Sequence, residues 1–145
     1  MKRYVVLNKQ VGETPLSSTE SWRATQSPAY KDVPLAYAGR LDPMASGKLL
    51  VLIGDECKRQ TDYHGLDKAY DFSVLLGVSS DTADVLGIVS SDEGVRYSQK
   101  QLTAVANKLI GAIELPYPHY SSKTVKGKPL HTWTLEGRLD EITVP

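Results

Sequence analysis

The residue best suited to do chemistry in this sequence is a single carboxylate, Asp42, in the segment 38–50. Gly39 permits a tight turn before it, and Pro43 fixes its own φ and disfavours a helical backbone at Asp42. The apolar run 49–53 that follows is typical of a buried strand. The sequence therefore predicts a carboxylate on a stiff loop, where it can act as a nucleophile or a general base. The alternative is a structural turn in which the aspartate only bonds nearby backbone.

Two further features are candidates for contacts with a ligand. Lys123, Lys126 and Lys128 lie within six residues of one another. That spacing suits phosphate groups, although an ordinary solvated surface gives the same pattern. Tyr70 falls in the alternating segment 68–76, whose apolar residues would share one face of a strand. On this pattern alone, the tyrosine is a core residue of a half-buried strand.

The elements that must position these residues include both strands and helices. Apolar runs and alternation predict strands over residues 4–7, 49–53, 68–76, 85–89 and 112–115. Caps and helical spacing predict four helices: from Ser17 or Ser18 to about Thr25, over 55–63, from the capping box of Ser98 and Gln101 to Gly111, and from Pro129 to Gly137. Because these elements do not alternate regularly as βαβ units, we predict an α+β fold with a mixed sheet and flanking helices.

The composition of the chain indicates how many domains to expect and which classes of protein it does not resemble. A chain of 145 residues predicts a single domain over residues 1–145. The 17 basic and 17 acidic residues cancel, which counts mildly against nucleic-acid binding, although the local distribution of charge matters more. Cys57 is the only cysteine, which excludes an internal disulfide and fits a reducing cytoplasm. Apolar runs are too short for a membrane span or a signal peptide, and no Cys/His cluster has the spacing of metal ligands.

Four segments, in order along the chain, resemble the motifs of one enzyme family. Residues 39–49 (GRLDPMASGKL) are similar to G-x-L-D-P-x-A-x-G-x-L, and residues 7–12 (LNKQVG) to L-D-K-P-x-G. Residues 67–87 are similar to D-K-x-Y…L-G…T-D-T-x-D-x-x-G, and residues 118–130 to P-x-Y-S-A-x-K-x-x-G-x-x-L. Together they resemble the TruB family of tRNA pseudouridine synthases across nearly the whole chain.

The resemblance implies a pseudouridine synthase fold and the isomerisation of a T-arm uridine of tRNA to pseudouridine, as in tRNA pseudouridine-55 synthase. It also implies flipping of the target base, and it implies no cofactor and no metal. Asp42 matches the essential aspartate of the family, and Tyr70 matches the active-site tyrosine that stacks on the extruded uracil. The cluster Lys123, Lys126 and Lys128 resembles part of the region that clasps RNA in the family. Lys68 is included among the predicted RNA-binding residues, with phosphate contact or a role in structuring the site as its two alternatives.

Two positions in the aspartate loop depart from the family pattern. Tyr37 stands where the family usually has the histidine that helps to extrude the base, and a tyrosine ring can fill similar space. Arg40 stands where the family has a small residue. Arg-Leu-Asp resembles the loop of other pseudouridine synthases, which act on ribosomal RNA and whose arginine assists flipping. We therefore include Tyr37 and Arg40 among the predicted RNA-binding residues.

The C-terminal residues 136–145 do not resemble the next motif of the family, a G-T-Y-x-R-like strand whose basic residue pairs with the aspartate. We therefore expect an incomplete fold, the N-terminal portion of the catalytic domain. Such a chain is a fragment, a shortened protein, or one that works as a homo-oligomer or with a second chain that completes the sheet. The alternative function is a non-catalytic RNA-binding or RNA-folding module derived from this fold.

Overall fold

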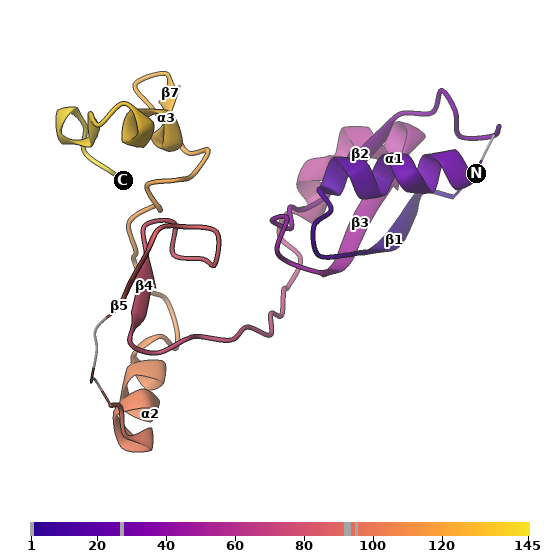
Figure 1. The fold of residues 1–145 in the computed structure, drawn as a ribbon. Coiled ribbons are helices and arrows are strands. Elements are labelled where there is room, and N and C mark those ends of the chain that lie inside the picture. Colours follow the sequence, from indigo (N-terminus) through magenta and orange to yellow (C-terminus); the bar gives the residue numbers. More distant parts are fainter. Residues whose placement is uncertain (1, 27, 92–93, 95) are drawn as a thin grey trace. The chain divides into compact units, whose positions relative to one another are not determined.

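A computed structural model describes residues 2–26, 28–91, 94 and 96–145. The chain divides into two units, Met1–Tyr70 and Asp71–Pro145, and we describe each by itself (Figure 1). Residues 1, 27, 92, 93 and 95 lie outside the described residues. The residues that match the aspartate loop of the family belong to the first unit, and the lysine cluster belongs to the second.

The first unit is built on a three-stranded antiparallel sheet. Strands β1 (Tyr4–Lys9), β2 (Leu35–Tyr37) and β3 (Gly47–Ile53) lie in the order β1-β3-β2. The register pairs Tyr4 with Leu52 and Lys9 with Gly47, so β1 pairs with all of β3 except its last residue, Ile53. The central strand supplies most of the buried apolar side chains of this unit, namely Leu49, Val51, Leu52 and Ile53. The strands predicted at 4–7 and 49–53 are therefore confirmed.

Helix α1 (Pro15–Thr25) follows β1 and packs against β1 and β2. The predicted helix is confirmed, but its cap is Thr14 rather than Ser17 or Ser18. Thr14 Oγ1 accepts the backbone N–H of Ser17 (3.0 Å), and Ser17 Oγ accepts that of Thr14 (2.9 Å). Pro15 at the start of the helix suits the first position, where no backbone N–H is needed. At the other end, Arg23 Nη1 donates to the carbonyls of Tyr30, Lys31 and Val33 and so ties the 28–34 loop to the helix.

The segment after β3 forms η1 (Gly54–Tyr63), a 3₁₀ helix with a break at Arg59. We predicted a helix over 55–63, which is confirmed in position, although its turns are tighter than those of an α-helix. The element packs against β2 and β3. Cys57 Sγ lies 3.4 Å from the carbonyls of Pro34 and Leu52, and this contact holds the start of η1 against both strands.

The second unit begins with a small hairpin and a helix. Strands β4 (Val78–Ser80) and β5 (Val89–Ser91) pair antiparallel. The strand predicted at 85–89 is wrong except for Val89, because Asp81 and Asp84 hold the intervening residues in a turn. Asp81 Oδ1 accepts the N–H of Ile88 (2.7 Å), and Asp84 Oδ1 accepts that of Leu86 (2.9 Å).

Helix α2 (Gln99–Lys108) begins with the predicted capping box of Ser98 and Gln101, which is confirmed. Ser98 Oγ accepts the backbone N–H of Gln101 (3.3 Å), and Gln101 Oε1 accepts that of Ser98 (2.9 Å). The last helical residue is Lys108, earlier than the predicted end at Gly111. Within the described residues, the helix buries none of its side chains.

Two predicted strands are not formed. Residues 68–76 and 112–115 lie outside the regular elements, and no described strand pairs with either segment. Phe72 and Val74, which would face a core, are exposed. Alternation specifies which side chains share a face, but a strand also needs a neighbouring strand to accept its backbone hydrogen bonds. These two predictions are therefore wrong for the chain as it folds here.

The C-terminal elements surround a small apolar centre. Strands β6 (Thr124–Val125) and β7 (Lys128–Pro129) form a hairpin, followed by α3 (Leu130–Leu135) and the 3₁₀ turn η2 (Leu139–Glu141). Lys126 and Gly127 both have positive φ (48° and 78°), as a two-residue hairpin turn of this kind requires. Leu130 and Trp133 are buried. The helix predicted between Pro129 and Gly137 is confirmed.

The α+β class is confirmed, since helices and strands do not alternate as parallel βαβ units. The strands of the described residues pair antiparallel in three small sheets, where we had expected one mixed sheet. The strands predicted at 68–76 and 112–115 would have enlarged a sheet, and neither forms. In the part of the chain that the structure covers, no helix combines the length and apolar character needed to cross a membrane.

Candidate active site

Asp42 lies at a surface hollow of about 280 Å³ in the first unit. The other residues that line the hollow come from the end of β2, the following loop and the start of α1: Tyr37, Arg40, Leu41, Pro43 and Pro15. Asp42 itself is exposed, so its carboxylate is open to solvent and to a ligand. The structure thus brings together three of the predicted site residues, Asp42, Tyr37 and Arg40.

The loop that carries Asp42 connects two neighbouring strands and is fixed at several points. The N–H of Ala38 donates to the carbonyl of Leu50 (2.8 Å), which continues the β2–β3 pairing by one residue. The carbonyl of Asp42 then accepts the N–H of Ala45 (2.9 Å) in a tight turn. The carbonyl of Pro43 accepts the N–H of Gly12 (2.8 Å). Because Pro43 also has a fixed φ, the backbone around Asp42 has little freedom left.

A second hollow, of about 470 Å³, adjoins the first, since Tyr37 and Arg40 line both. Gln60 and His64 of the η1 region line its other side, together with Leu35, Ala36 and Gly39. Gln60 Nε2 donates to the carbonyl of Tyr37 (2.7 Å) and so fixes the end of β2 against η1. The two hollows together offer an aromatic ring, a guanidinium, an imidazole and a carboxylate on one surface of the unit.

The element η1 is held in place by a buried carboxylate, Glu56, which is 7% exposed. Arg3 of the N-terminal segment donates to both of its oxygens (2.7 and 3.0 Å), and the hydroxyl of Tyr63 donates to one of them (2.7 Å). Arg59 also lies within ion-pair distance (3.3 Å). The hydrogen bonds from Arg3 and Tyr63 lower the pKa of Glu56 to about 2. This network joins the segment directly before β1 to η1, which carries Gln60.

Tyr70 and Lys68 come from the extended segment at the end of the first unit. Tyr70 is 63% exposed and does not line either of the two hollows described above. Its predicted place on a half-buried strand is therefore wrong, because residues 68–76 are not part of a sheet. Lys68 Nζ donates to the carbonyls of His64 (3.0 Å) and Leu66 (2.8 Å), so in this structure it closes the turn after η1.

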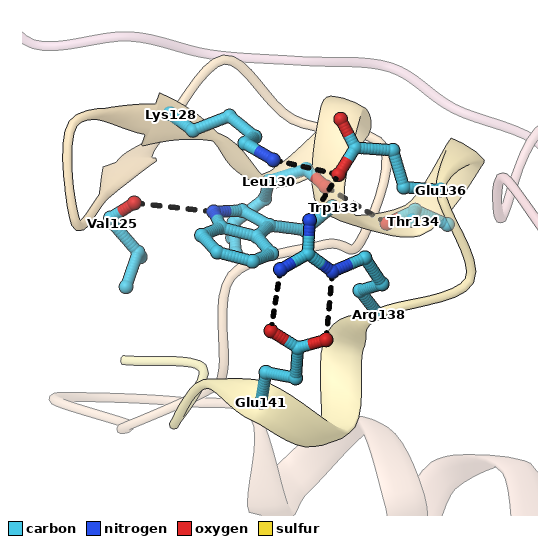
Figure 2. Close-up of polar contacts among 8 residues, drawn as sticks. All are labelled: Val125, Lys128, Leu130, Trp133, Thr134, Glu136, Arg138 and Glu141. Carbon is cyan, nitrogen blue, oxygen red and sulfur yellow. Dashed lines mark hydrogen bonds and ion pairs between the residues drawn. The ribbon is translucent and has the colours of Figure 1, made fainter.

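The three lysines of the predicted RNA-binding cluster have different surroundings in the second unit. Figure 2 shows Lys128 paired with Glu136 (2.6 Å), and its ammonium lies 4.1 Å from the centre of the Trp133 ring. Lys126 Nζ donates to the backbone carbonyl of Glu141 (3.0 Å), and Lys123 lies 4.6 Å from the centre of the Tyr117 ring. Only Lys128 has its charge balanced by a carboxylate among these contacts.

The same indole is flanked by a second cation, Arg138. Its guanidinium carbon lies 5.3 Å from the centre of the Trp133 ring, and its nitrogens donate to both oxygens of Glu141 (2.7 Å each; Figure 2). Trp133 Nε1 donates to the carbonyl of Val125 (3.1 Å). Hydrogen bonds and charge from Glu141 raise the pKa of Arg138, and those from Lys128 and Arg138 lower the pKa of Glu136. This cluster fixes β6, β7, α3 and η2 to one another.

Sequence reasoning missed two residues that shape the site, Lys9 and Gln60. Lys9 is completely buried, and its ammonium donates to the carbonyls of Gln10, Glu13 and Pro43. It lies in the segment 7–12 that matches a family motif, but nothing in its residue type indicates this burial. Gln60 falls in a predicted helix, and its bond to the carbonyl of Tyr37 joins parts of the chain that are distant in sequence. Among the described residues, no group of three or more His, Cys, Asp or Glu side chains is arranged to hold a metal ion.

Comparison with known proteins identifies the family to which this arrangement belongs. The model of the TruB family pseudouridylate synthases (N-terminal domain) matches residues 29–144. The tRNA pseudouridine synthase B of Caldicellulosiruptor saccharolyticus is 34% identical over 103 residues, which make up 71% of this chain and 36% of that protein. The tRNA pseudouridine synthase 4 of Saccharomyces cerevisiae is 35% identical over 108 residues (73% of this chain, 27% of that protein).

A further relative, the tRNA pseudouridine synthase B of Methylobacillus flagellatus, is 30% identical over 133 residues, or 92% of this chain and 43% of that protein. The chain thus spans less than half of the length of each of these relatives. The match to the family model covers most of the chain, including the whole aspartate loop and the lysine cluster. The chain belongs to the TruB family of pseudouridylate synthases, in the part that corresponds to their N-terminal domain.

Proposed function

We propose that this chain isomerises a uridine in the T arm of tRNA to pseudouridine, with Asp42 as the nucleophile. The observation that carries the proposal is the hollow in which an exposed Asp42, on a backbone fixed on both sides of Pro43, lies beside Tyr37 and Arg40. The names of the relatives, which are tRNA pseudouridine synthases, support the reaction class. A catalytic domain over residues 1–145 stays a prediction.

The proposed reaction needs only a positioned carboxylate and proton transfers. The bond between C1′ of the ribose and N1 of uracil breaks, the base turns over, and a bond forms between C1′ and C5. The proton on C5 leaves and N1 gains one, so the nucleotide keeps its composition. The carboxylate of Asp42 adds to the reacting nucleotide and is released at the end. Because nothing is oxidised, reduced or transferred from outside, we propose that the reaction uses no cofactor.

The remaining site residues would hold the RNA and the extruded base. Flipping a base costs a few kcal/mol, which contacts in the site must offset. We propose that the Tyr37 ring fills the space that the base leaves and that Arg40 binds the adjacent phosphate. An exposed tyrosine such as Tyr70 can stack on the uracil, a contact worth roughly 1–3 kcal/mol. Lys68 uses two of its three ammonium donors on the carbonyls of His64 and Leu66, and we propose that the third binds phosphate.

The test uses the full chain, a T-arm hairpin RNA and a chemical readout specific for pseudouridine. Asp42→Asn keeps the shape of the side chain and removes the nucleophile, so we expect no pseudouridine and an unchanged dissociation constant for the RNA. Asp32→Asn is the matched control, because Asp32 is an exposed aspartate in the same unit that lines neither hollow. Turnover by Asp42→Asn at the rate of the control would refute the role of Asp42.

A second candidate function, RNA binding without turnover, is favoured by one observation. None of the ion pairs in the described residues involves Asp42. The same experiment separates the two functions. Binding of the hairpin RNA with no pseudouridine formed by the wild-type chain would favour the binding module, and any turnover that depends on Asp42 would exclude it.

We also propose that the chain associates with a second copy of itself. Strands β1 and β2 each have one edge without a neighbour in the sheet, and unpaired edges favour association. In the second unit, Phe72, Ile88 and Ile110 are largely exposed, and burial of such side chains would stabilise a dimer. Light scattering at several concentrations tests this proposal, and a mass that stays at that of one chain would refute it.

A further inference from the structure

The backbone carbonyl of Tyr37, the last residue of β2, points out of the sheet. In the described residues β2 pairs with β3 alone, and the register sets Tyr37 opposite Val51. The N–H of the next residue, Ala38, donates to the carbonyl of Leu50 (2.8 Å). Because hydrogen-bonded and non-hydrogen-bonded pairs alternate along an antiparallel ladder, the Tyr37–Val51 pair is a non-hydrogen-bonded one. The Tyr37 carbonyl therefore needs a donor from outside the sheet.

Gln60 of η1 supplies that donor. Its Nε2 lies 2.7 Å from the Tyr37 carbonyl oxygen, at the short end of the range for N–H···O bonds. The Gln60 side chain is half-buried, so the bond is partly shielded from water. Earlier in η1, Cys57 Sγ contacts the carbonyl of Pro34 (3.4 Å), directly before β2. Two side chains of η1 thus hold the two ends of this short strand, and Gln60 holds the end that carries Tyr37.

The Tyr37 side chain lies where the two hollows meet, since it lines both of them. Gln60 lines the larger hollow and does not line the hollow of Asp42. Any effect of Gln60 on the Asp42 hollow must therefore pass through another residue, and Tyr37 is the one whose backbone it binds. The place of the ring follows the place of this backbone, because the side chain leaves it at a fixed angle.

We infer that Gln60 is a positioning residue, which holds the Tyr37 ring at the boundary of the two hollows so that the ring can take the place of the flipped base. The inference rests on the role proposed above for Tyr37. Without the bond from Gln60, the Tyr37 carbonyl would turn toward water, and the end of β2 would depend on the bond from Ala38. A displaced ring would offset less of the cost of flipping.

The experiment compares Gln60→Met with a control that loosens η1 elsewhere. Methionine keeps about the length of glutamine and removes its amide group. Cys57→Ala is the matched control, because it removes the other contact between η1 and the β2 segment, and Cys57 lines neither hollow. Both variants are compared at a temperature at which unfolding measurements show the first unit to be folded.

The first readout is amide hydrogen exchange in the free chain, which does not depend on RNA. The two probes are the Ala38 amide, beside Tyr37, and the Gly54 amide, which donates to the carbonyl of Pro34 at the other end of β2 (2.8 Å). For Gln60→Met, exchange at Ala38 should accelerate roughly two- to tenfold relative to Gly54, as loss of one hydrogen bond allows. For Cys57→Ala, exchange at Ala38 should match the wild-type chain. Equal changes at the two amides in Gln60→Met would overturn the inference.

The second readout is base flipping in a T-arm hairpin RNA that carries 2-aminopurine beside the target uridine. The fluorescence of this base rises when its neighbour leaves the stack, and its extent at saturating protein gives the equilibrium constant for flipping. Gln60→Met should lower this constant roughly two- to tenfold, and Cys57→Ala should leave it unchanged. In a Tyr37→Ala chain, Gln60→Met should have no further effect, because the two residues act as one unit. The same loss in both backgrounds would overturn the inference.

A pseudouridine assay on the same RNA separates this inference from the proposed function. A rise in fluorescence with no pseudouridine formed by the wild-type chain would refute the proposed turnover and leave the role of Gln60 intact. An unchanged equilibrium constant in Gln60→Met would overturn the inference, even with faster exchange at Ala38. A wild-type chain that causes no rise in fluorescence would also overturn it, because Tyr37 would then have no flipped base to replace.

Discussion

The lysine cluster allows a sharp prediction, because its three charges are compensated to different degrees. Each phosphate contact made by a lysine contributes about 0.7–0.9 to the slope of log K against log salt. If all three lysines bound phosphate, replacing them with alanine would make the slope shallower by about two to three units. Lys128, however, pairs with Glu136 at 2.6 Å and is only 28% exposed. We therefore expect it to contribute nothing to the slope.

Lys123 and Lys126 keep their charges available to RNA. The partner of Lys123 is an aromatic ring, and that of Lys126 is a neutral carbonyl. For the double variant Lys123→Ala with Lys126→Ala, the salt slope should become shallower by about 1.4–1.8. Between about 50 mM and about 200 mM salt, the variant should then lose roughly tenfold less affinity than the wild-type chain. Fluorescence anisotropy with the T-arm hairpin RNA at four or more salt concentrations measures the slope.

Lys128→Ala is the matched control, since it removes the same charge from the same hairpin. We expect an unchanged slope and a lower melting temperature of the second unit, because the side chain pairs with Glu136 and packs on Trp133. A slope change for Lys128→Ala of about half that of the double variant, one phosphate contact, would show that RNA displaces Glu136 and would refute the reasoning. An unchanged slope in the double variant would show that these lysines only solvate a surface.

Two more predictions concern the stability of the first unit. Leu52→Ala should lower the free energy of unfolding by roughly 2–5 kcal/mol in urea denaturation, since it removes a fully buried side chain from the central strand; a loss well below that range would mean that the site collapses around the smaller residue. Because the pKa of Glu56 is lowered from 4.5 to about 2 on folding, its contribution to stability is present above pH 4.5 and is lost as the pH falls toward 2. Thermal melts over this range should show that Glu56→Gln flattens the decline, and an equally steep decline in the variant would assign it to other carboxylates.

Local signals in the sequence predicted the elements whose ends carry their own caps. Ser98 with Gln101 and the span from Pro129 to Gly137 specify helix ends through bonds within a few residues, and both predictions are confirmed. Thr14 was missed as a cap, because the residue three positions later is Ser17 rather than the usual Glu or Gln. The alternating segment 68–76 was wrongly predicted as a strand, because nothing in the segment itself indicates whether a neighbouring strand is present to pair with it.

The candidate site follows the same division between local and distant contacts. Tyr37, Arg40 and Asp42 lie within six residues, so one short loop brings them together, and the sequence was sufficient to group them. Lys9 and Gln60 join that loop from other elements. A lysine at the end of a strand is usually exposed, and its burial depends on carbonyls that only the folded turn and loop supply. Such residues are visible only once the fold is known.

The order of strands in the first sheet also determines when the aspartate loop can form during synthesis. Strands β1 and β2 do not touch each other in the sheet, and each pairs only with β3. A nascent chain that ends before Gly47 therefore holds two of the three strands and no partner for either. The sheet can close only when the ribosome has released β3, and until then the two strands that flank the aspartate loop cannot pair. The loop and the sheet are thus expected to become ordered in one step, late in the synthesis of this unit.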